Sequence, residues 1–214
     1  MKSERYTPES WQRQYSPVAD WDETFRNGQW HALGELSQTA RHAIVAGYVH
    51  KLVGRGHVLD AGCGEGVLID YFDPARIEYT GFDLSPTAIQ RAKERHPGLR
   101  LSSCAIEAFV PPEGLRYDAV IFNDSLSTLK QPMEMLDRYW SFVTPAGFII
   151  ISQFQPAEAN HNGALLTRMF EAELEAGRYE LMVRSEVLNP DTNRRWRSYC
   201  LRRGQMGGQR QESI

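Results

Sequence analysis

The chain has 214 residues, 42% of them hydrophobic and 24% charged, which suits one well-filled core and is too short for two. Its formal net charge of −3 gives no field that would gather a polyanion, so no nucleic-acid partner is expected. Three cysteines without disulfide or metal spacing indicate reduced thiols in a cytoplasmic protein, and no apolar run approaches the roughly 20 residues that cross a membrane.

The N-terminal part of the chain, residues 1–38, is rich in aromatic residues but shows no sustained period, which indicates a cap rather than a core element. From Thr39 onwards, apolar residues recur every four positions and predict an amphipathic helix; they are Ala40, Ile44, Tyr48 and Leu52. This helix is expected to stop at Gly54 and Gly56.

After this helix the chain alternates strand-like and helix-like segments. Strands are expected at 57–61, 78–83, 99–104, 117–123, 148–154, 179–188 and 194–202. Helices are expected at 85–96, opened by Ser85 and Pro86, from Gln131 to Val143, ended by Pro145 and Gly147, and at 163–177.

The alternation favours one α/β domain over residues 39–203, with an open, mostly parallel sheet and helices on both faces. The last residues, 204–214, lack the apolar content that would order them and are expected to form a flexible tail. In such sheets, ligands bind beyond the carboxyl ends of the strands, at the switch point next to the first strand.

The stretch VLDAGCGEGVLIDYF, residues 58–72, lies at that switch point. Asp60 closes the first strand. The glycines at alternate positions, Gly62, Gly64 and Gly66, occupy the turn into the next helix, where the absence of Cβ atoms lets a ligand lie on the backbone. The spacing D-x-G-x-G-x-G differs from the G-x-G-x-x-G of dinucleotide folds, and no Lys-Ser/Thr follows as in a P-loop, so a diphosphate is not favoured.

The second strand ends in a carboxylate. Asp83 can accept hydrogen bonds from both ribose hydroxyls of a nucleoside, and Leu84 beside it can face the adenine. Together with the glycine turn, these residues describe a pocket for a nucleoside with a short polar tail.

The chain resembles the class I S-adenosylmethionine-dependent methyltransferases, and four motifs in the family's order carry the likeness. They are VLDAGCGEG, GFDLSPTAIQRAKER, YDAVIFNDSL and FVTPAGFIIISQF, and they lie within residues 40–155. The resemblance implies a Rossmann-like, doubly wound, seven-stranded and mostly parallel sheet, S-adenosyl-L-methionine as the cofactor, and methyl transfer as the reaction.

The resemblance also implies roles for individual residues. The three glycines would face the methionine portion of the cofactor, Asp60 would help hold its amino group, and Asp83 would bind the ribose. Asn123 would lie under the sulfonium. Arg41 would pair with the methionine carboxylate, unless it is a solvated arginine on a helix face.

The end of the third strand departs from the family's pattern. Many members carry there an acidic residue that binds the exocyclic amine of adenine, and Cys104 stands in its place. Backbone groups of Cys104, Ala105 and Ile106 would then make the adenine contact.

Methyl transfer asks the protein mainly to place a nucleophile in line with the methyl group and to exclude water. A base is required only when the acceptor arrives protonated. Asp124 and His161 are the candidate catalytic residues, and Ser125 is a candidate substrate contact, because they follow the fourth and fifth strands. The alternatives are a polar loop role for His161 and, for Asp124, binding of a cationic amine or capping of the next turn.

The aromatic N-terminal part is expected to form a lid over the acceptor. Its candidate substrate contacts are Tyr15, Trp21, Phe25, Trp30 and His31. The alternative is that these residues only fasten the arm to the sheet.

We therefore expect a methyltransferase that modifies nitrogen or oxygen of a small molecule, with secondary metabolism as one setting. The sequence NDSL after the fourth strand, in place of N-P-P-Y/F, disfavours the DNA- and glutamine-modifying enzymes, and no carboxylate cluster indicates a metal site. A non-catalytic S-adenosylmethionine-binding regulator and a nicotinamide-dependent oxidoreductase stay open as alternatives. The sequence also leaves open the acceptor and the oligomeric state, monomer or homodimer.

Overall fold

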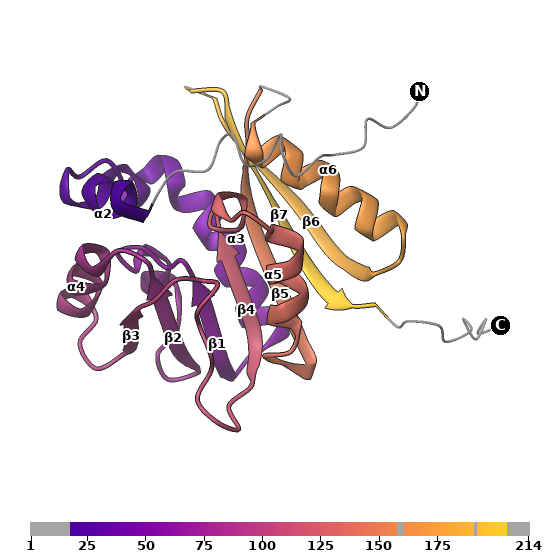
Figure 1. Ribbon diagram of the computed structural model, residues 1–214, viewed down its shortest axis with the longest axis horizontal. Helices are drawn as coiled ribbons and strands as arrows, with labels where there is room; N and C mark the ends of the chain where they lie inside the picture. The colour runs from indigo at the N-terminus through magenta and orange to yellow at the C-terminus, as the bar shows by residue number, and fades with distance from the viewer. Residues whose placement is uncertain (1–17, 158–160, 191, 205–214) are drawn as a thin grey trace.

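The computed structural model describes residues 18–157, 161–190 and 192–204. Its centre is a seven-stranded sheet with strand order β3-β2-β1-β4-β5-β7-β6 (Figure 1). Strands β1 to β5 run parallel, and β7 pairs antiparallel with both β5 and β6. The predicted doubly wound, mostly parallel sheet is thus confirmed.

The bounds of the elements are as follows. The strands are β1 Gly56–Ala61, β2 Ile77–Asp83, β3 Arg100–Ser103, β4 Tyr117–Asn123, β5 Val143–Gln155, β6 Tyr179–Asn189 and β7 Arg194–Arg203. The α-helices are α2 Val18–Arg26, α3 Leu36–Leu52, α4 Pro86–Arg95, α5 Pro132–Trp140 and α6 Asn162–Glu175, and the short 3-10 helices are η1 His31–Gly34, η2 Val67–Tyr71 and η3 Leu126–Thr128.

The sheet separates two hydrophobic cores, because successive residues of a strand point to opposite faces. In β5, Ile149 and Ile151 belong to one core and Ile150 belongs to the other. Helices α5 and α6 cover the first core, and α3 and α4 cover the second. This two-sided burial explains why β4 and β5 are nearly continuous apolar runs.

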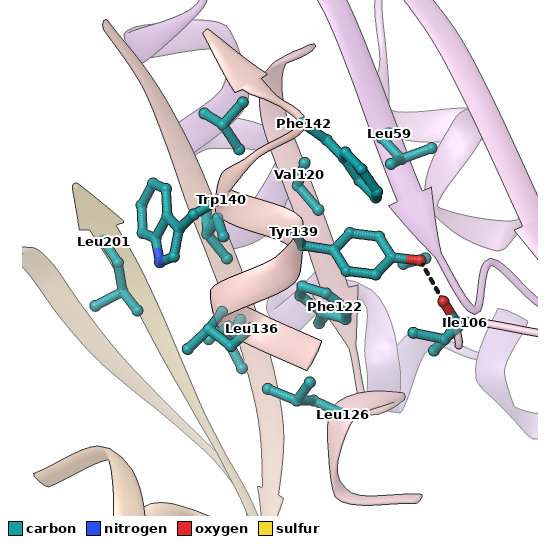
Figure 2. Packing of buried hydrophobic residues seen from close by; sticks show 14 of the residues in the cluster. Leu59, Ile106, Val120, Phe122, Leu126, Leu136, Tyr139, Trp140, Phe142 and Leu201 are labelled. Carbon is teal, nitrogen blue, oxygen red and sulfur yellow. Dashed lines mark hydrogen bonds between the residues drawn. The ribbon is translucent and has the colours of Figure 1, made fainter. Parts of the chain in front are cut away.

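Figure 2 shows the first core around α5. The side chains of Leu136 and Tyr139 lie against the strands and are fully buried. The hydroxyl of Tyr139 donates a hydrogen bond to the Ile106 carbonyl at 2.8 Å, so this core is joined to the turn that follows β3.

The end of the helix predicted from Gln131 was placed too late. Helix α5 ends at Trp140, and Val143, which was predicted on its apolar face, begins β5 instead. The physical reason is that the chain after α5 pairs with β4. The Tyr117 amide of β4 donates a hydrogen bond to the Phe142 carbonyl at 2.9 Å, so the sheet begins where the helix was expected to continue.

Three further differences concern element boundaries. Pro145 and Gly147, predicted to end that helix, lie inside β5. The glycine turn leads into η2 rather than into a full helix, and α3 begins three residues before Thr39. The predicted cap contains α2 and η1; the rest of it, residues 1–17, and the tail from residue 205 lie outside the described residues.

The topology brings the ends of three strands together. The strand order reverses at β1, because β2 and β3 continue on one side of it and β4 and β5 on the other. The final residues of β1, β2 and β4, which are Ala61, Asp83 and Asn123, therefore meet at one edge of the sheet. Within the part of the chain that the structure describes, no helix has the length and apolar character needed to span a bilayer.

Candidate active site

A cavity lies at the carboxyl ends of β1, β2 and β4, at the predicted switch point. The glycine turn and the ends of β2 and β4 line it from the sheet. The start of α3 and the turn at 105–107 also border it, and the N-terminal cap contributes Trp21, Phe25 and Trp30.

At Gly62 in the glycine turn, the Ser125 side chain leaves no room for a Cβ atom. Gly62 has a φ of +84°, and a Cβ there would lie 2.6 Å from the Cβ of Ser125. Ser125 is fixed in that place, since its hydroxyl donates to the Ala61 carbonyl at 2.5 Å. The backbone of the turn is therefore open to a ligand, as its sequence predicted.

Asp83 presents both carboxylate oxygens at the cavity. Oδ1 accepts the Ser85 amide and Oδ2 accepts the Gly64 amide, each at 2.9 Å. Burial raises the pKa of Asp83, and the two amide donors oppose that shift. Each oxygen retains a second lone pair, so the carboxylate can still accept two hydrogen bonds from a neighbouring pair of hydroxyls.

Asp60 lies deeper, with 1% of its surface exposed. Its Oδ2 accepts the Tyr79 hydroxyl at 2.7 Å, whereas Oδ1 has no hydrogen-bond partner among the described residues. Burial raises the pKa of Asp60 to about 7. A cationic donor reaching into the cavity would satisfy this oxygen and favour its ionised form.

Arg41 is buried, with 2% of its surface exposed, so the alternative of a solvated helix-face arginine is wrong. Its Nε donates to Gln38 at 2.7 Å, and its Nη1 donates to Asn123 and Asp124 at 2.7 and 2.9 Å. The guanidinium also lies over the ring of Trp196, 5.3 Å from the centroid. Arg41 thus connects α3 to the ends of β4 and β7.

Asp124 is the carboxylate that pairs with Arg41, and it adopts a left-handed backbone conformation with a φ of 59°. Besides Arg41, its carboxylate accepts the Phe154 amide at 2.6 Å and the Trp196 indole N–H at 3.0 Å. Burial raises the pKa of Asp124, and the charge of Arg41 opposes that shift. With three donors already in place, this carboxylate is held as a structural centre beside the cavity.

The turn after β3 borders the cavity through Ala105, Ile106 and Glu107. Cys104, which was predicted as a cofactor contact, is not among the lining residues and packs instead against the first core. Leu84, predicted to face the adenine, does line the cavity. Glu107 was not selected from the sequence, although Cys104 stands three positions earlier in the place of the family's acidic residue.

The cap lies over the side of the cavity that the glycine turn lines. The rings of Trp21 and Trp30 stack at 5.7 Å, and Phe25 lies over the glycine turn, 3.4 Å from where a Cβ of Gly64 would be. Arg91 of α4 donates to the Phe25 carbonyl at 2.7 Å. The aromatic residues therefore cover the turn and fasten the cap at the same time.

Asp22 makes a second connection between the cap and α4. Its Oδ1 accepts the Ser85 hydroxyl at 2.6 Å and the Thr87 amide at 3.0 Å. Figure 1 shows α2 lying beside α4 at this edge of the sheet.

Among the predicted site residues that the structure describes, Gly66, Cys104, His31 and His161 do not line the cavity. His161 is exposed and begins α6, where its Nδ1 accepts the Gly163 amide at 3.1 Å, so it acts as a helix cap. His31 lies on the outside of the cap, 3.9 Å from Glu65, and does not line the cavity. Tyr15 lies outside the described residues.

Several lining residues were missed by the sequence analysis. They are Leu33, His42, Cys63, Glu65, Val67, Leu68, Thr128 and Leu129, in addition to Glu107. The apolar ones among them look like ordinary core positions in the sequence. Within the described ranges, no group of three or more His, Cys, Asp or Glu side chains could hold a metal ion.

Comparison with protein families identifies one match, to the family described as "Methyltransferase domain", over residues 59–149. A ubiquinone biosynthesis O-methyltransferase of Albidiferax ferrireducens is 27% identical over 100 residues, which are 44% of this chain and 40% of that protein. A malonyl-[acyl-carrier protein] O-methyltransferase of Halalkalibacterium halodurans is 30% identical over 108 residues, which are 46% of this chain and 39% of that protein. The chain thus spans less than half the length of these curated relatives.

Solved structures resemble the chain over most of its length. A 1,6-didemethyltoxoflavin-N1-methyltransferase of Burkholderia thailandensis, with 1,6-didemethyltoxoflavin and S-adenosylhomocysteine bound, has a TM-score of 0.70 and 20% identity, covering 96% of this chain and 94% of that one. The N-methyltransferase NodS of Bradyrhizobium japonicum, in complex with S-adenosylhomocysteine, has a TM-score of 0.65 and 16% identity, covering 92% of this chain and 98% of that one. The chain thus matches the methyltransferase-domain family over residues 59–149 and shares the fold of these solved methyltransferases.

Proposed function

We propose that the protein is an enzyme that transfers a methyl group from S-adenosylmethionine to a nitrogen or oxygen of a small molecule, with secondary metabolism as one setting. The observation that carries the proposal is the polar lining of the cavity. Asp83 offers two oxygens beside the glycine turn, and Asp60 offers a buried oxygen without a partner among the described residues. A nucleoside with a charged amino-acid tail would satisfy both carboxylates.

The lining fits the cofactor portion by portion. Gly62 and Gly64 line the cavity with backbone alone, and a Cβ at Gly62 would collide with Ser125. Asp83 accepts hydrogen bonds from the ribose hydroxyls, and Asp60 accepts one from the ammonium group. The turn at 105–107 and Leu84 border the space that is left for the adenine.

When bound, the cofactor supplies an electrophilic methyl group carried on a sulfonium. The protein's own contribution is to orient the acceptor and to keep water out. Trp21, Phe25 and Trp30 cover the cavity with apolar surface and serve the second purpose. Asn123 and Ser125 lie at its polar end, and Arg41 holds Asn123 in place.

We assign Asp124 the role of a positioning residue rather than a base. Arg41 and Trp196 both donate to its Oδ2 and the Phe154 amide donates to its Oδ1, so three donors fix this side chain in place. No proton transfer is assigned to His161, because it caps α6 and does not line the cavity.

The acceptor is proposed to be small. Among the similar proteins are O-methyltransferases and an N-methyltransferase whose structure contains a small acceptor beside S-adenosylhomocysteine, which supports this size class for either acceptor atom. Trp21, Trp30 and Ser125 line the cavity and are the proposed acceptor contacts.

Calorimetric titration with S-adenosylhomocysteine tests the cofactor part of this proposal. The wild-type protein should bind it, and Asp83→Ala should weaken binding by at least roughly severalfold through the loss of charge-assisted hydrogen bonds to the ribose. Glu78→Ala is the matched control, because Glu78 lies on the same strand but is exposed, far from the cavity end. Binding of NAD in place of S-adenosylhomocysteine would overturn the proposal.

The transfer itself is tested by incubating the protein with S-adenosylmethionine and one of three acceptor classes: phenols, amines or ring-nitrogen heterocycles. The release of S-adenosylhomocysteine is measured. Turnover with one of these classes would identify the acceptor atom. Tight cofactor binding without release of S-adenosylhomocysteine in the presence of any of these acceptors would instead favour a non-catalytic regulator.

A further inference from the structure

His42 is a buried histidine at the cavity that has no role in the site described so far. It lies on α3 next to Arg41, with 1% of its surface exposed, and it lines the cavity. Its ring packs edge-on against Tyr71, with the centroids 5.7 Å apart. Its Nδ1 has no hydrogen-bond partner among the described residues.

An unpaired polar atom in a buried ring destabilises the folded protein unless a ligand or water satisfies it. The other histidine on the inner part of this helix, His50, shows the ordinary solution, since its Nε2 lies 3.0 Å from the Tyr71 carbonyl. His42 therefore differs from a packed core histidine in lacking such a partner at a position that faces a ligand cavity.

The surroundings of His42 decide which ligand group would suit it. Burial and the adjacent charge of Arg41 lower the pKa of His42 to about 3, so its ring is neutral and carries one N–H donor. Arg41 uses Nε and Nη1 for contacts within the protein, and no bond of its Nη2 to a described residue is found. A neutral donor beside a cation matches an anionic ligand group, not a cationic one.

We propose that His42 is a specificity residue for the amino-acid end of the cofactor, where its ring N–H and Arg41 hold the α-carboxylate while Asp60 holds the ammonium. The inference rests on the proposed function, because it assigns a residue to the same cofactor. It divides the two charges of the amino-acid tail between two sides of the cavity, α3 for the carboxylate and the end of β1 for the ammonium.

Three probes test the assignment by calorimetry: S-adenosylhomocysteine, its decarboxylated form, which keeps the amine, and methylthioadenosine, which lacks both groups. His42→Phe keeps the ring contact with Tyr71 but removes the donor. The variant should bind S-adenosylhomocysteine roughly tenfold or more weakly than the wild type, because a hydrogen bond to the charged carboxylate is lost. Its affinity for the other two probes, which lack the carboxylate, should be unchanged.

Two conservative variants identify the donor atom. His42→Asn places an amide near the position of Nδ1, and His42→Gln places one near Nε2; one of them should restore much of the affinity. His57→Phe is the matched control, since His57 lies near the start of β1, at the opposite end from the cavity. This variant should bind all three probes like the wild type.

The outcomes separate the two proposals. Unchanged affinity for S-adenosylhomocysteine in His42→Phe, or an equal loss for all three probes, would overturn the role of His42 while the cofactor assignment stands. Failure of the wild-type protein to bind any adenosyl probe would overturn the proposed function itself. Should His42→Phe lower the melting temperature too far for titration, the asparagine and glutamine variants decide the question: the proposal requires that one of them bind S-adenosylhomocysteine more weakly than the wild type but the other two probes equally, and it is overturned if both bind all three probes like the wild type.

Discussion

Asp60 is a buried carboxylate whose ionisation should control cofactor binding. Its pKa is raised to about 7 by burial, and only the ionised form attracts an ammonium group. Below pH 7 the carboxylate is protonated, so binding must first remove that proton. We therefore expect the affinity for S-adenosylhomocysteine to fall by about tenfold between pH 7.5 and pH 6, because each pH unit below the pKa costs a factor of ten.

Calorimetry at a series of pH values measures this effect. Methylthioadenosine, which has no ammonium group, should bind equally across the range, and Asp60→Asn should bind S-adenosylhomocysteine weakly and without the pH dependence. A wild-type affinity that stays constant from pH 7.5 to pH 6 would contradict the prediction.

Single residues of the site could be predicted when their role depends on local backbone geometry. The glycine turn and Asp83 follow from the chain pattern, because the turn and the adjacent strand end are close in sequence and in space. Arg41 could not be assigned in this way, since its partners Asn123 and Asp124 lie 82 and 83 positions away. His161 was selected as a base because it follows the fifth strand and can take a proton near neutral pH, but its backbone position makes it a helix cap.

Helix α2 is held to the domain by a small number of polar contacts, which makes its docking testable. Asp22 accepts hydrogen bonds from the Ser85 hydroxyl and the Thr87 amide, and these donors lower its pKa. Its folded-state pKa lies below its unfolded value, so this contribution to docking is present at neutral pH and is lost only in strong acid.

Asp22→Ala should loosen the cap and weaken S-adenosylhomocysteine binding by roughly threefold to tenfold, the effect of about 1 kcal/mol from a lost cap interaction. Hydrogen exchange over residues 18–34 should become faster in the same variant. Glu23→Ala, an exposed change on the same helix, should behave like the wild type. Equal binding and equal exchange in the two variants would show that Asp22 does not fasten the cap.

At the scale of elements, the central strands β1, β4 and β5 were predictable because each contains a short apolar run and helices cover both faces of the sheet. Helix ends were less predictable. The face containing Met133, Leu136 and Trp140 has helical spacing, but the spacing cannot show that the next residues pair with β4 instead. The cap was recognised by composition only, so α2 and its place over the glycine turn did not follow from the sequence.

For the whole molecule, the alternation of strands and helices predicted the doubly wound architecture, and the two cores on either side of the sheet give the physical reason. The cavity exists because the strand order reverses at β1. What the sequence could not supply is the closure of that cavity, which depends on α3 and the cap meeting β4, β7 and α4 through contacts between distant residues.

Stability of the whole domain should depend on the core under α5 (Figure 2). Leu136 is fully buried there, so Leu136→Ala should lower the free energy of unfolding by about 2–5 kcal/mol, from lost transfer energy and the cavity left behind. Leu36→Ala is the matched control: Leu36 begins α3 with 87% of its surface exposed and should cost less than about 0.5 kcal/mol. Urea unfolding followed by circular dichroism measures both, and similar losses in the two variants would mean that α5 does not pack as described.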